Sequence, residues 1–295
     1  MATARDLKNK IRSIRNTRKI TRTMEMIATA KASICQKRIE SVKPYGDRLT
    51  EMLRDLRGAA VDSGDGAGDY PLLRRPERIE REAVFVISAN RGLCGGYNTN
   101  VLRMAEKHLD RRSAEGVATE VHMVGKKGIT RFRYLRREVT GKHTQFDDRP
   151  SFEAAAEVLE PLLASFCAGD LDAVTLISTR YQNAARQVPI LRPILPIPLG
   201  GEEGGDGRGH AVDFIFEPSP DVILGTLLPL SLKMQLFLAL VEAAASEQIQ
   251  RRIAMKNATD NADEMETKYK QIYNRTRQAG ITQEILEVLG GSEVL

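Results

Sequence analysis

The sequence has 295 residues, enough for two ordinary domains or for one domain with an extended element. It contains no Trp and only 5% aromatic residues, which argues against a large enzymatic core, whereas 28% charged residues suit solvated helical faces. The formal net charge of +5 favours an acidic partner, which would be nucleic acid, a membrane surface or an acidic protein.

Positive charge is concentrated at the N-terminus, where eight Lys or Arg between Met1 and Arg22 stand against one acid, Asp6. This stretch is basic and amphipathic, as a mitochondrial presequence would be, but its periodicity continues into Ile34 and beyond. We therefore expect a folded helix. No run of about 18 apolar residues occurs, so we expect no membrane span. Three widely spaced cysteines with no metal-site spacing indicate buried thiols in a reducing compartment.

The first segment, residues 1–57, is predicted to be one long coiled-coil helix. Steps of four and three residues give an inward row, and a repeat of this kind predicts a left-handed supercoil. The row comprises Leu7, Ile11, Ile14, Arg18, Thr21, Glu25, Ala28, Ala32, Cys35, Ile39, Val42, Gly46, Leu49, Leu53 and Leu56. A second row, Ile20, Met24, Ile27 and Ile34, broken by Lys31, is either a misphased core or a contact for an outside partner.

The middle of the chain, residues 81–200, predicts an α/β domain of Rossmann-like type. A linker rich in Gly and Asp precedes it at 58–80, and a Gly-rich loop and connection follows at 201–218. Continuous apolar runs predict buried strands at 83–87, 120–124 and 173–177, and two prolines limit 188–195 to an edge strand. Helical patterns at 102–109, 128–135 and 152–166 alternate with these strands, which predicts a mostly parallel sheet.

The last segment, residues 219–295, repeats the coiled-coil pattern, with Pro229 as a possible kink. Its row comprises Ile223, Leu227, Leu230, Met234, Phe237, Val241, Ala244, Gln248, Arg251, Met255, Ala258, Ala262, Met265, Tyr269, Ile272, Thr276, Ala279, Gln283 and Leu286. At about 1.5 Å per residue, the two helices would be roughly 80 and 105 Å long, too long to lie inside a domain of about 140 residues. We expect them to pair as a long antiparallel coiled coil.

Both helices meet the central domain, so Leu56 should lie near residue 220 and residue i near residue 276 minus i. This register brings Glu25 near Arg251, and the alternative is that the two are unrelated solvated positions. It also leaves about 280–289 projecting beyond the first helix, with apolar side chains that require a socket on another protein.

The loop from Ala89 to Asn98 follows a buried strand and precedes a helix, as a phosphate-binding loop does. It matches neither common nucleotide-binding pattern, so a tight turn that needs glycine is the favoured interpretation. Cys94 has no recognisable His partner, and the carboxylates form no evident acid/base pair. We predict no catalytic, cofactor-binding or metal-binding residues.

Three groups of motifs in this order resemble the gamma subunit of a bacterial-type ATP synthase. They are Lys10-Ile11-Arg12-Ser13-Ile14, Asn16-Thr17 and residues 19–28 near the N-terminus, residues 91–98 in the middle, and Ser246-Glu247-Gln248, 255–261 and 273–285 near the end. The resemblance covers the whole chain and implies a non-catalytic central-stalk rotor. Asn90, where Asp is common, and Gly280, where Ser is frequent, are small departures. The Gly-rich loop has no cysteines, so thiol control of the photosynthetic type is not expected.

The resemblance also implies partners and contact residues. The coiled coil would turn inside a hexamer of alpha and beta subunits, and the α/β domain would stand on the membrane c-ring beside the epsilon subunit. The complex would hold the chain on the cytoplasmic face of the bacterial plasma membrane. Contacts with beta would be made by Arg12, Arg15, Arg18, Lys19, Arg22, Met24, Arg251, Gln278 and Thr282, and the tip in the hexamer sleeve would comprise Ile281, Ile285, Leu286, Val288 and Leu289.

Two rival interpretations come from other classes of protein. One is an α/β enzyme with coiled-coil arms. The other is a coiled-coil nucleic-acid binder. The basic N-terminus has no aromatic residues on which bases could stack, which argues against this second interpretation. We therefore expect no nucleic-acid partner.

Overall fold

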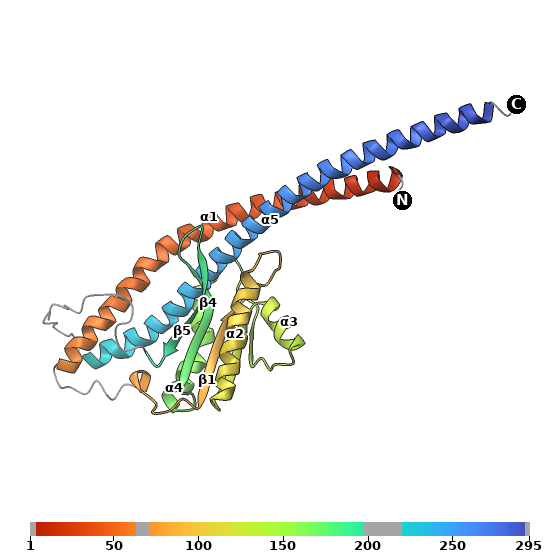
Figure 1. Ribbon diagram of the computed structural model, residues 1–295. Helices are drawn as coiled ribbons and strands as arrows, with labels where there is room; N and C mark the ends of the chain where they lie inside the picture. Colours follow the sequence, from red (N-terminus) through yellow and green to blue (C-terminus); the bar gives the residue numbers. More distant parts are fainter. Residues whose placement is uncertain (1–3, 63–70, 198–219, 293–295) are drawn as a thin grey trace. The chain divides into compact units, whose positions relative to one another are not determined.

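A computed structural model describes residues 4–62, 71–197 and 220–292 of the chain (Figure 1). The chain divides into two compact units. One unit, Met1–Ala30 with Arg251–Leu295, contains the outer parts of the two terminal helices, and the other, Lys31–Gln250, contains the remaining chain. Each unit is described by itself below.

Two long helices, α1 (Ala4–Asp62) and α5 (Pro220–Ser292), begin and end the described chain. α1 continues five residues beyond the expected end at Arg57, into the segment predicted to be linker. Pro44 and Pro229 lie inside these helices and remove one backbone donor each, yet neither proline ends its helix.

The central sheet has five strands in the order β3-β2-β1-β4-β5. They are β1 (Arg81–Ile87), β2 (Ala118–Val124), β3 (Gly141–His143), β4 (Ala173–Tyr181) and β5 (Gln187–Leu195). The first four are parallel, with Val84 opposite both Val121 and Thr175, and β5 runs antiparallel to β4 at one edge. The predicted mostly parallel sheet is confirmed. Pro189 and Pro193 lie in β5, which is compatible with an edge strand because proline cannot donate to a second neighbour.

Helices cover both faces of the sheet. α2 (Tyr97–Ala114) and α3 (Lys126–Tyr134) pack on one face, where Val86 meets Leu102 and Phe132. α4 (Phe152–Ala168) and the first part of α5 pack on the other face, together with the short helix η1 (Pro71–Leu73). α4 has strong end signals: Ser151 Oγ accepts from Ala154 N at 3.1 Å, and Gly169 closes the helix with φ 84°.

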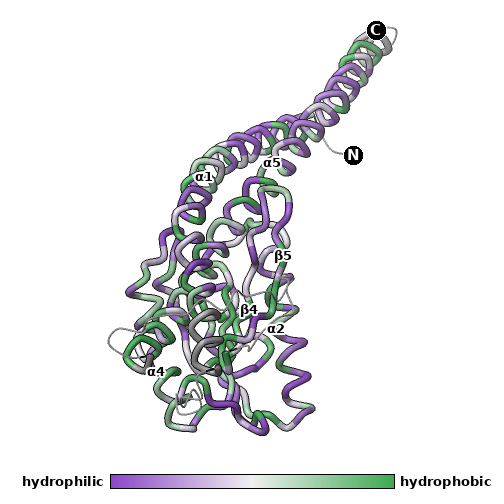
Figure 2. Tube along the Cα trace, turned by 90° about the vertical axis from the view of Figure 1, so that its left-hand side faces the viewer, coloured by the Kyte–Doolittle hydropathy of each residue, from purple (hydrophilic) through white to green (hydrophobic). Residues whose placement is uncertain are grey.

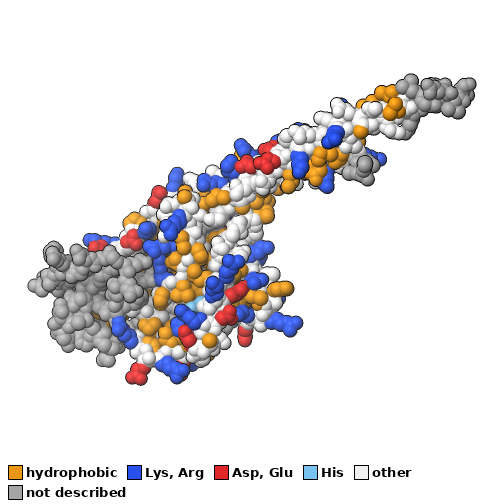
Figure 3. Space-filling view, viewed as in Figure 1, with side chains coloured by type: hydrophobic (Ala, Val, Ile, Leu, Met, Phe, Trp, Pro, Cys, Tyr) orange, Lys and Arg blue, Asp and Glu red, His pale blue; other side chains and the backbone are white. Residues whose placement is uncertain are grey.

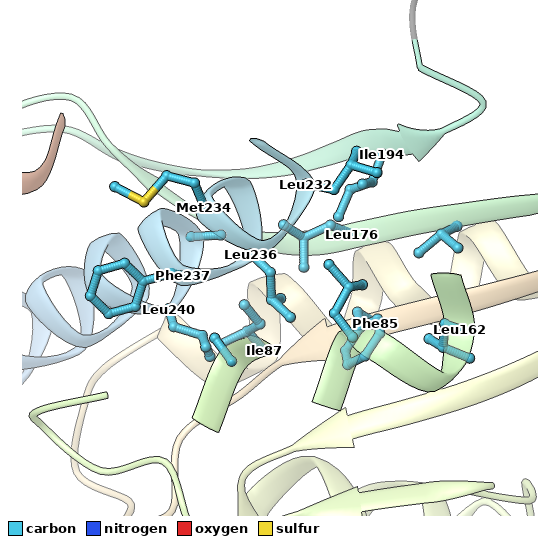
Figure 4. Close-up of a cluster of buried hydrophobic side chains, with 14 of the residues drawn as sticks. Phe85, Ile87, Leu162, Leu176, Ile194, Leu232, Met234, Leu236, Phe237 and Leu240 are labelled. Carbon is cyan, nitrogen blue, oxygen red and sulfur yellow. The ribbon is translucent and has the colours of Figure 1, made fainter. Parts of the chain in front are cut away.

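The first part of α5 belongs to the core of the α/β unit. By length and composition, α5 is apolar enough between Val222 and Gln283 to cross a membrane, contrary to our expectation of no such segment. Within the unit, however, Leu232, Leu236 and Leu240 are buried in one cluster with the strand residues Phe85, Ile87 and Ile194, and Figure 4 shows Leu232 near Ile194 and Leu240 near Ile87. Full burial of one such side chain stabilises by roughly 1.5–3 kcal/mol, so this contact attaches α5 firmly to the sheet. Hydrophilic residues predominate towards the C-terminal end of α5 (Figure 2).

Candidate interaction surface on the terminal helices

The predicted seam of α1 is confirmed, because every described member is buried or half-buried. Its buried members are Leu7, Thr21, Ala28, Ala32, Cys35, Ile39 and Leu49. Leu56 has a side chain outside the described residues. The four-and-three spacing identified the inward face correctly because a helix repeats that face every 3.5 residues when it is supercoiled.

The predicted seam of α5 is correct up to Ala262 and then needs a correction. Met265 and Ile272 are 53% and 40% exposed, whereas Glu266 is buried. The residues of this part of α5 that are buried or half-buried at spacings of four and three are Met255, Thr259, Ala262, Glu266, Tyr269, Tyr273 and Thr276. The four-and-three spacing placed Met265 inward, but Glu266 is the buried residue, and Arg15 and Lys270 pair with its Oε1 atom.

Four contacts in the outer unit fix how the helices pair. Arg15 Nη2 lies 3.0 Å from Glu266 Oε1, and Arg18 pairs with Asp263. Thr259 Oγ1 lies 2.8 Å from Thr21 Oγ1. The fourth contact places Lys10 Nζ 5.3 Å from the centre of the Tyr269 ring.

The numbers of these paired residues total 279 to 281, so residue i lies opposite about 280 minus i. The expected register, 276 minus i, is wrong by about one helical turn, because α1 continues past Leu56. The proposed contact between Glu25 and Arg251 is therefore displaced from a directly facing position. The contact stays a prediction. In the structure Arg251 is half-buried, and Glu25 lies near a different arginine, with Arg22 Nη1 4.0 Å from Glu25 Oε2.

The basic row on α1 divides into two kinds of residue. Arg15 and Arg18 hold α5 through Glu266 and Asp263. Arg12 and Lys19 are exposed and have no carboxylate within ion-pair distance among the residues that the structure describes. Lys270 also reaches Glu266, at 2.8 Å, and together with Arg15 it lowers the pKa of the Glu266 carboxyl. The pairing of the helices thus uses part of the basic charge and leaves the rest accessible.

An apolar row lies on a different face of α1. Ile20, Met24 and Ile27 are 57%, 36% and 51% exposed. Successive helix residues are about 100° apart, so these three share one face, whereas Arg22 points roughly opposite to Met24. Since the row is exposed, it is not a misphased core within this chain. Figure 3 shows hydrophobic and cationic side chains together on the visible face of these helices.

The C-terminal part of α5 continues past the start of α1, since Ala4 pairs near residue 276 in the observed register. Ile281, Ile285 and Leu286 are 47%, 54% and 59% exposed, as expected for a projecting tip. The side chains of Val288 and Leu289 lie outside the described residues. Gln278 and Thr282 are exposed, and Thr282 Oγ1 donates to the Gln278 carbonyl at 3.0 Å.

The loop from Ala89 to Asn98 is closed by internal hydrogen bonds, and its Asn90 side chain bonds to the segment after β3. Asn98 Oδ1 accepts from Ala89 N at 2.9 Å, and Asn98 Nδ2 donates to Cys94 Sγ at 3.2 Å. Leu93 and Gly95 adopt φ of 62° and 56°, the left-handed conformation that favours glycine. These features favour the tight turn over a phosphate site. No group of three or more His, Cys, Asp or Glu among the described residues could hold a metal ion.

Comparisons with known proteins agree with this arrangement. The family described as ATP synthase matches residues 3–295. The ATP synthase gamma chain of Leptospira biflexa is 41% identical over 295 residues, with all of both chains covered. That of Gemmatimonas aurantiaca is 42% identical over 297 residues and covers 100% of this chain and 99% of the relative.

The chain belongs to the ATP synthase gamma-chain family. This confirms the resemblance drawn from the sequence, and it makes the chain a non-catalytic stalk subunit. The gamma-chain fold recurs in a solved mitochondrial ATP synthase of Euglena gracilis, with a TM-score of 0.64 at 20% identity and coverage of 99% and 94%. It also recurs in the central stalk and c-ring structure from Tetrahymena thermophila, with a TM-score of 0.58 at 21% identity and coverage of 81% and 99%.

Proposed function

We propose that this gamma chain is the rotor of an ATP synthase, coupling ion flow through a membrane c-ring to conformational change at the nucleotide sites of an alpha/beta hexamer. The observation that carries the proposal is the antiparallel pairing of α1 with α5 in the outer unit, in a chain related to gamma chains over its whole length. Nucleotide chemistry belongs to the hexamer, and this chain contributes the coupling.

A rotor acts only through differences between its faces, because a contact biases a neighbouring subunit by its differential affinity for that subunit's conformations. The paired helices have such differences. Ile20, Met24 and Ile27 make one apolar face, whereas Arg22 points away from it. As the rod turns, a fixed beta subunit would meet apolar and cationic faces in succession.

The proposed contacts with beta are Met24 on the apolar face, the basic residues Arg12, Arg15, Arg18, Lys19 and Arg22, and Arg251, Gln278 and Thr282 on α5. Arg12 and Lys19 are the best candidates for an acidic loop, because Arg15 and Arg18 are already engaged by α5. An exposed Met24 supports its role, since an apolar side chain in water gains from being covered.

The proposed tip comprises Ile281, Ile285, Leu286, Val288 and Leu289, held in an apolar sleeve of the hexamer. The exposure of its first three members supports this placement. We also propose epsilon and the c-ring as partners of the α/β unit, and attachment to the cytoplasmic face of a bacterial plasma membrane through the complex alone.

Co-purification tests the proposal. The full chain, tagged and co-expressed with alpha and beta subunits of the same organism, should elute with a nucleotide-hydrolysing hexamer at one copy per hexamer. The isolated chain should show no turnover. A chain that never joins the hexamer would contradict the proposal. Turnover by the isolated chain would instead favour the enzyme, and salt-dependent binding to duplex DNA would favour the nucleic-acid binder.

A further inference from the structure

The loop between β3 and α4 touches both long helices within the α/β unit. Asp148 is the centre of this contact. Its Oδ2 lies 2.5 Å from Lys31 Nζ on α1, and its Oδ1 accepts from Gln248 Nε2 on α5 at 2.5 Å. The Cys35 thiol donates to the Asp148 carbonyl at 3.6 Å. One residue of the α/β body therefore bonds to both helices, through two side-chain oxygens and a main-chain oxygen.

The surroundings of Asp148 give these bonds strength. Gln248 is only 2% exposed, and the side chains of Lys31 and Asp148 are 36% and 33% exposed. Charge-assisted hydrogen bonds in partly desolvated positions are shorter and stronger than neutral ones. The loop itself is anchored by Phe146, which is 8% exposed and belongs to the apolar core of the unit.

Asn90, in the segment that follows β1, holds the loop that carries Asp148 in place. Asn90 Nδ2 donates to the Phe146 carbonyl at 2.8 Å and to Asp147 Oδ1 at 3.1 Å. Asn90 Oδ1 accepts from Lys126 N at 3.1 Å, at the start of α3. A single amide thus connects the ends of two parallel strands to the loop that carries Asp148.

The other polar ties between the helices and the rest of the α/β unit each engage one helix alone. Lys233 Nζ on α5 lies 3.4 Å from Glu160 Oε1 on α4. Gln36 Nε2 donates to the Tyr181 hydroxyl at 3.0 Å, and Gln250 Nε2 donates to Gln187 Oε1 at 2.8 Å. Apolar packing of α5 on the sheet is extensive and non-directional, whereas a hydrogen bond requires a particular orientation of its two partners. Asp148 is the contact that can best fix the angle of the helices on the body.

We propose that Asp148, positioned by Asn90, transmits torque between the α/β body and the paired helices by bonding Lys31 and Gln248 together. This role rests on the proposed rotor function. A force that turns the body is passed to α1 and α5 at once, so the two helices move as a pair. Asn90 acts through the loop and is a positioning residue.

The test uses the assembled complex with the hexamer fixed to a surface and a probe on Cys167, the exposed cysteine of α4. The variance of the probe angle during a nucleotide dwell reports torsional stiffness. Asp148→Asn should widen this variance while ATP hydrolysis by the hexamer is kept. Charge-assisted hydrogen bonds are roughly twice as strong as neutral ones, and the other ties and the apolar packing remain, so the variance should rise by less than about twofold.

Asp110→Asn is the matched control, because the Asp110 pair with Arg137 makes the same chemical type of contact but joins only α2 to the segment after α3. It should leave the variance unchanged. If Asp148→Asn does not assemble, Lys31→Gln removes the same charge pair from the helix side and should widen the variance too. Adding Asn90→Ala to Asp148→Asn should widen it little further, since both act on one contact.

Equal variance in wild type, Asp148→Asn and Lys31→Gln would overturn the proposal and leave apolar packing as the torque-bearing contact. Failure of the rotor function itself would look different, because the wild-type probe would then show no nucleotide-dependent angle at all.

Discussion

Thr259 donates a hydrogen bond to Thr21 across the buried seam of the terminal helices, at 2.8 Å between the two Oγ1 atoms. Thr21 is 8% exposed and Thr259 is 4% exposed. Thr21 in turn donates to the Arg18 carbonyl at 3.0 Å, which leaves its oxygen free to accept. A polar pair inside an apolar seam satisfies its hydrogen bonds in one register only, so it opposes slippage of one helix along the other.

Removing this pair should cost stability in a non-additive way. Thr21→Val and Thr259→Val should each lower the free energy of unfolding by about 1 kcal/mol, because each leaves a buried hydroxyl with fewer partners. The double variant should lose less than the sum, since no hydroxyl is then left behind. Urea denaturation followed by circular dichroism measures these values. Simple additivity would show that the two hydroxyls are not coupled.

The Glu266 cluster predicts a pH dependence of the same helices. Lys270 and Arg15 lower the pKa of the Glu266 carboxyl below its ordinary value of 4.5. Stability from this group is therefore fully present above about pH 4.5 and is lost as the pH falls through the lower folded value. The protection factors of α1 and α5 amides against hydrogen exchange, which correct for the pH dependence of the intrinsic exchange rate, should fall over that range.

Glu266→Gln should remove part of this acid sensitivity, because an amide does not titrate. The exposed Glu264, two residues away, supplies the matched control Glu264→Gln, which should keep the wild-type profile. The same acid response in Glu266→Gln as in wild type would assign the sensitivity to other carboxylates.

Met24 offers a test of the proposed contact with beta. Met24→Lys adds a charge to the apolar face of α1 and should impair proton-linked ATP synthesis more than assembly of the complex. Met26 is 57% exposed and points roughly away from Met24, so Met26→Lys is a control of equal charge and length. Equal coupling in the two variants would count against the Met24 contact.

The cysteines should differ strongly in reactivity. Burial, with a further contribution from the Asp148 carboxylate, raises the pKa of the Cys35 thiol to about 11. At pH 8 it is therefore almost entirely protonated, and the thiolate is the reactive form. Iodoacetamide should label exposed Cys167 first, and mass spectrometry of the peptides measures this. Labelling of Cys35 as fast as Cys167 in the native chain would contradict the buried seam.

Sequence periodicity predicted the elements whose burial follows a regular apolar pattern along the chain. The inward face of α1 and the strands at 83–87, 120–124 and 173–177 were correct because burial forces a regular apolar pattern. β3 was missed because three residues carry no such pattern. Of the polar seam residues, Gln248 was recognised, but its partner Asp148 lies in a loop and is brought to it only by the fold.

The register shows the same limit. Sequence indicated antiparallel pairing, but the facing residues depend on where each helix ends, and α1 ends at Asp62. A register error of one helical turn assigns the wrong partner to every residue, although the face of each helix that points inward stays the same. The seam of α5 after Ala262 was misassigned for a related reason: the four-and-three spacing placed Met265 inward, whereas Glu266 is the buried residue, with three cations near its carboxylate.

Rotation of the chain against the hexamer is the most direct test of the account. A bead attached at Cys167, with the hexamer fixed to glass, should turn in one direction in discrete steps when ATP is supplied, and should stop when ATP is removed. A hexamer that hydrolyses ATP at its full rate while the bead keeps one fixed angle would contradict the rotor function.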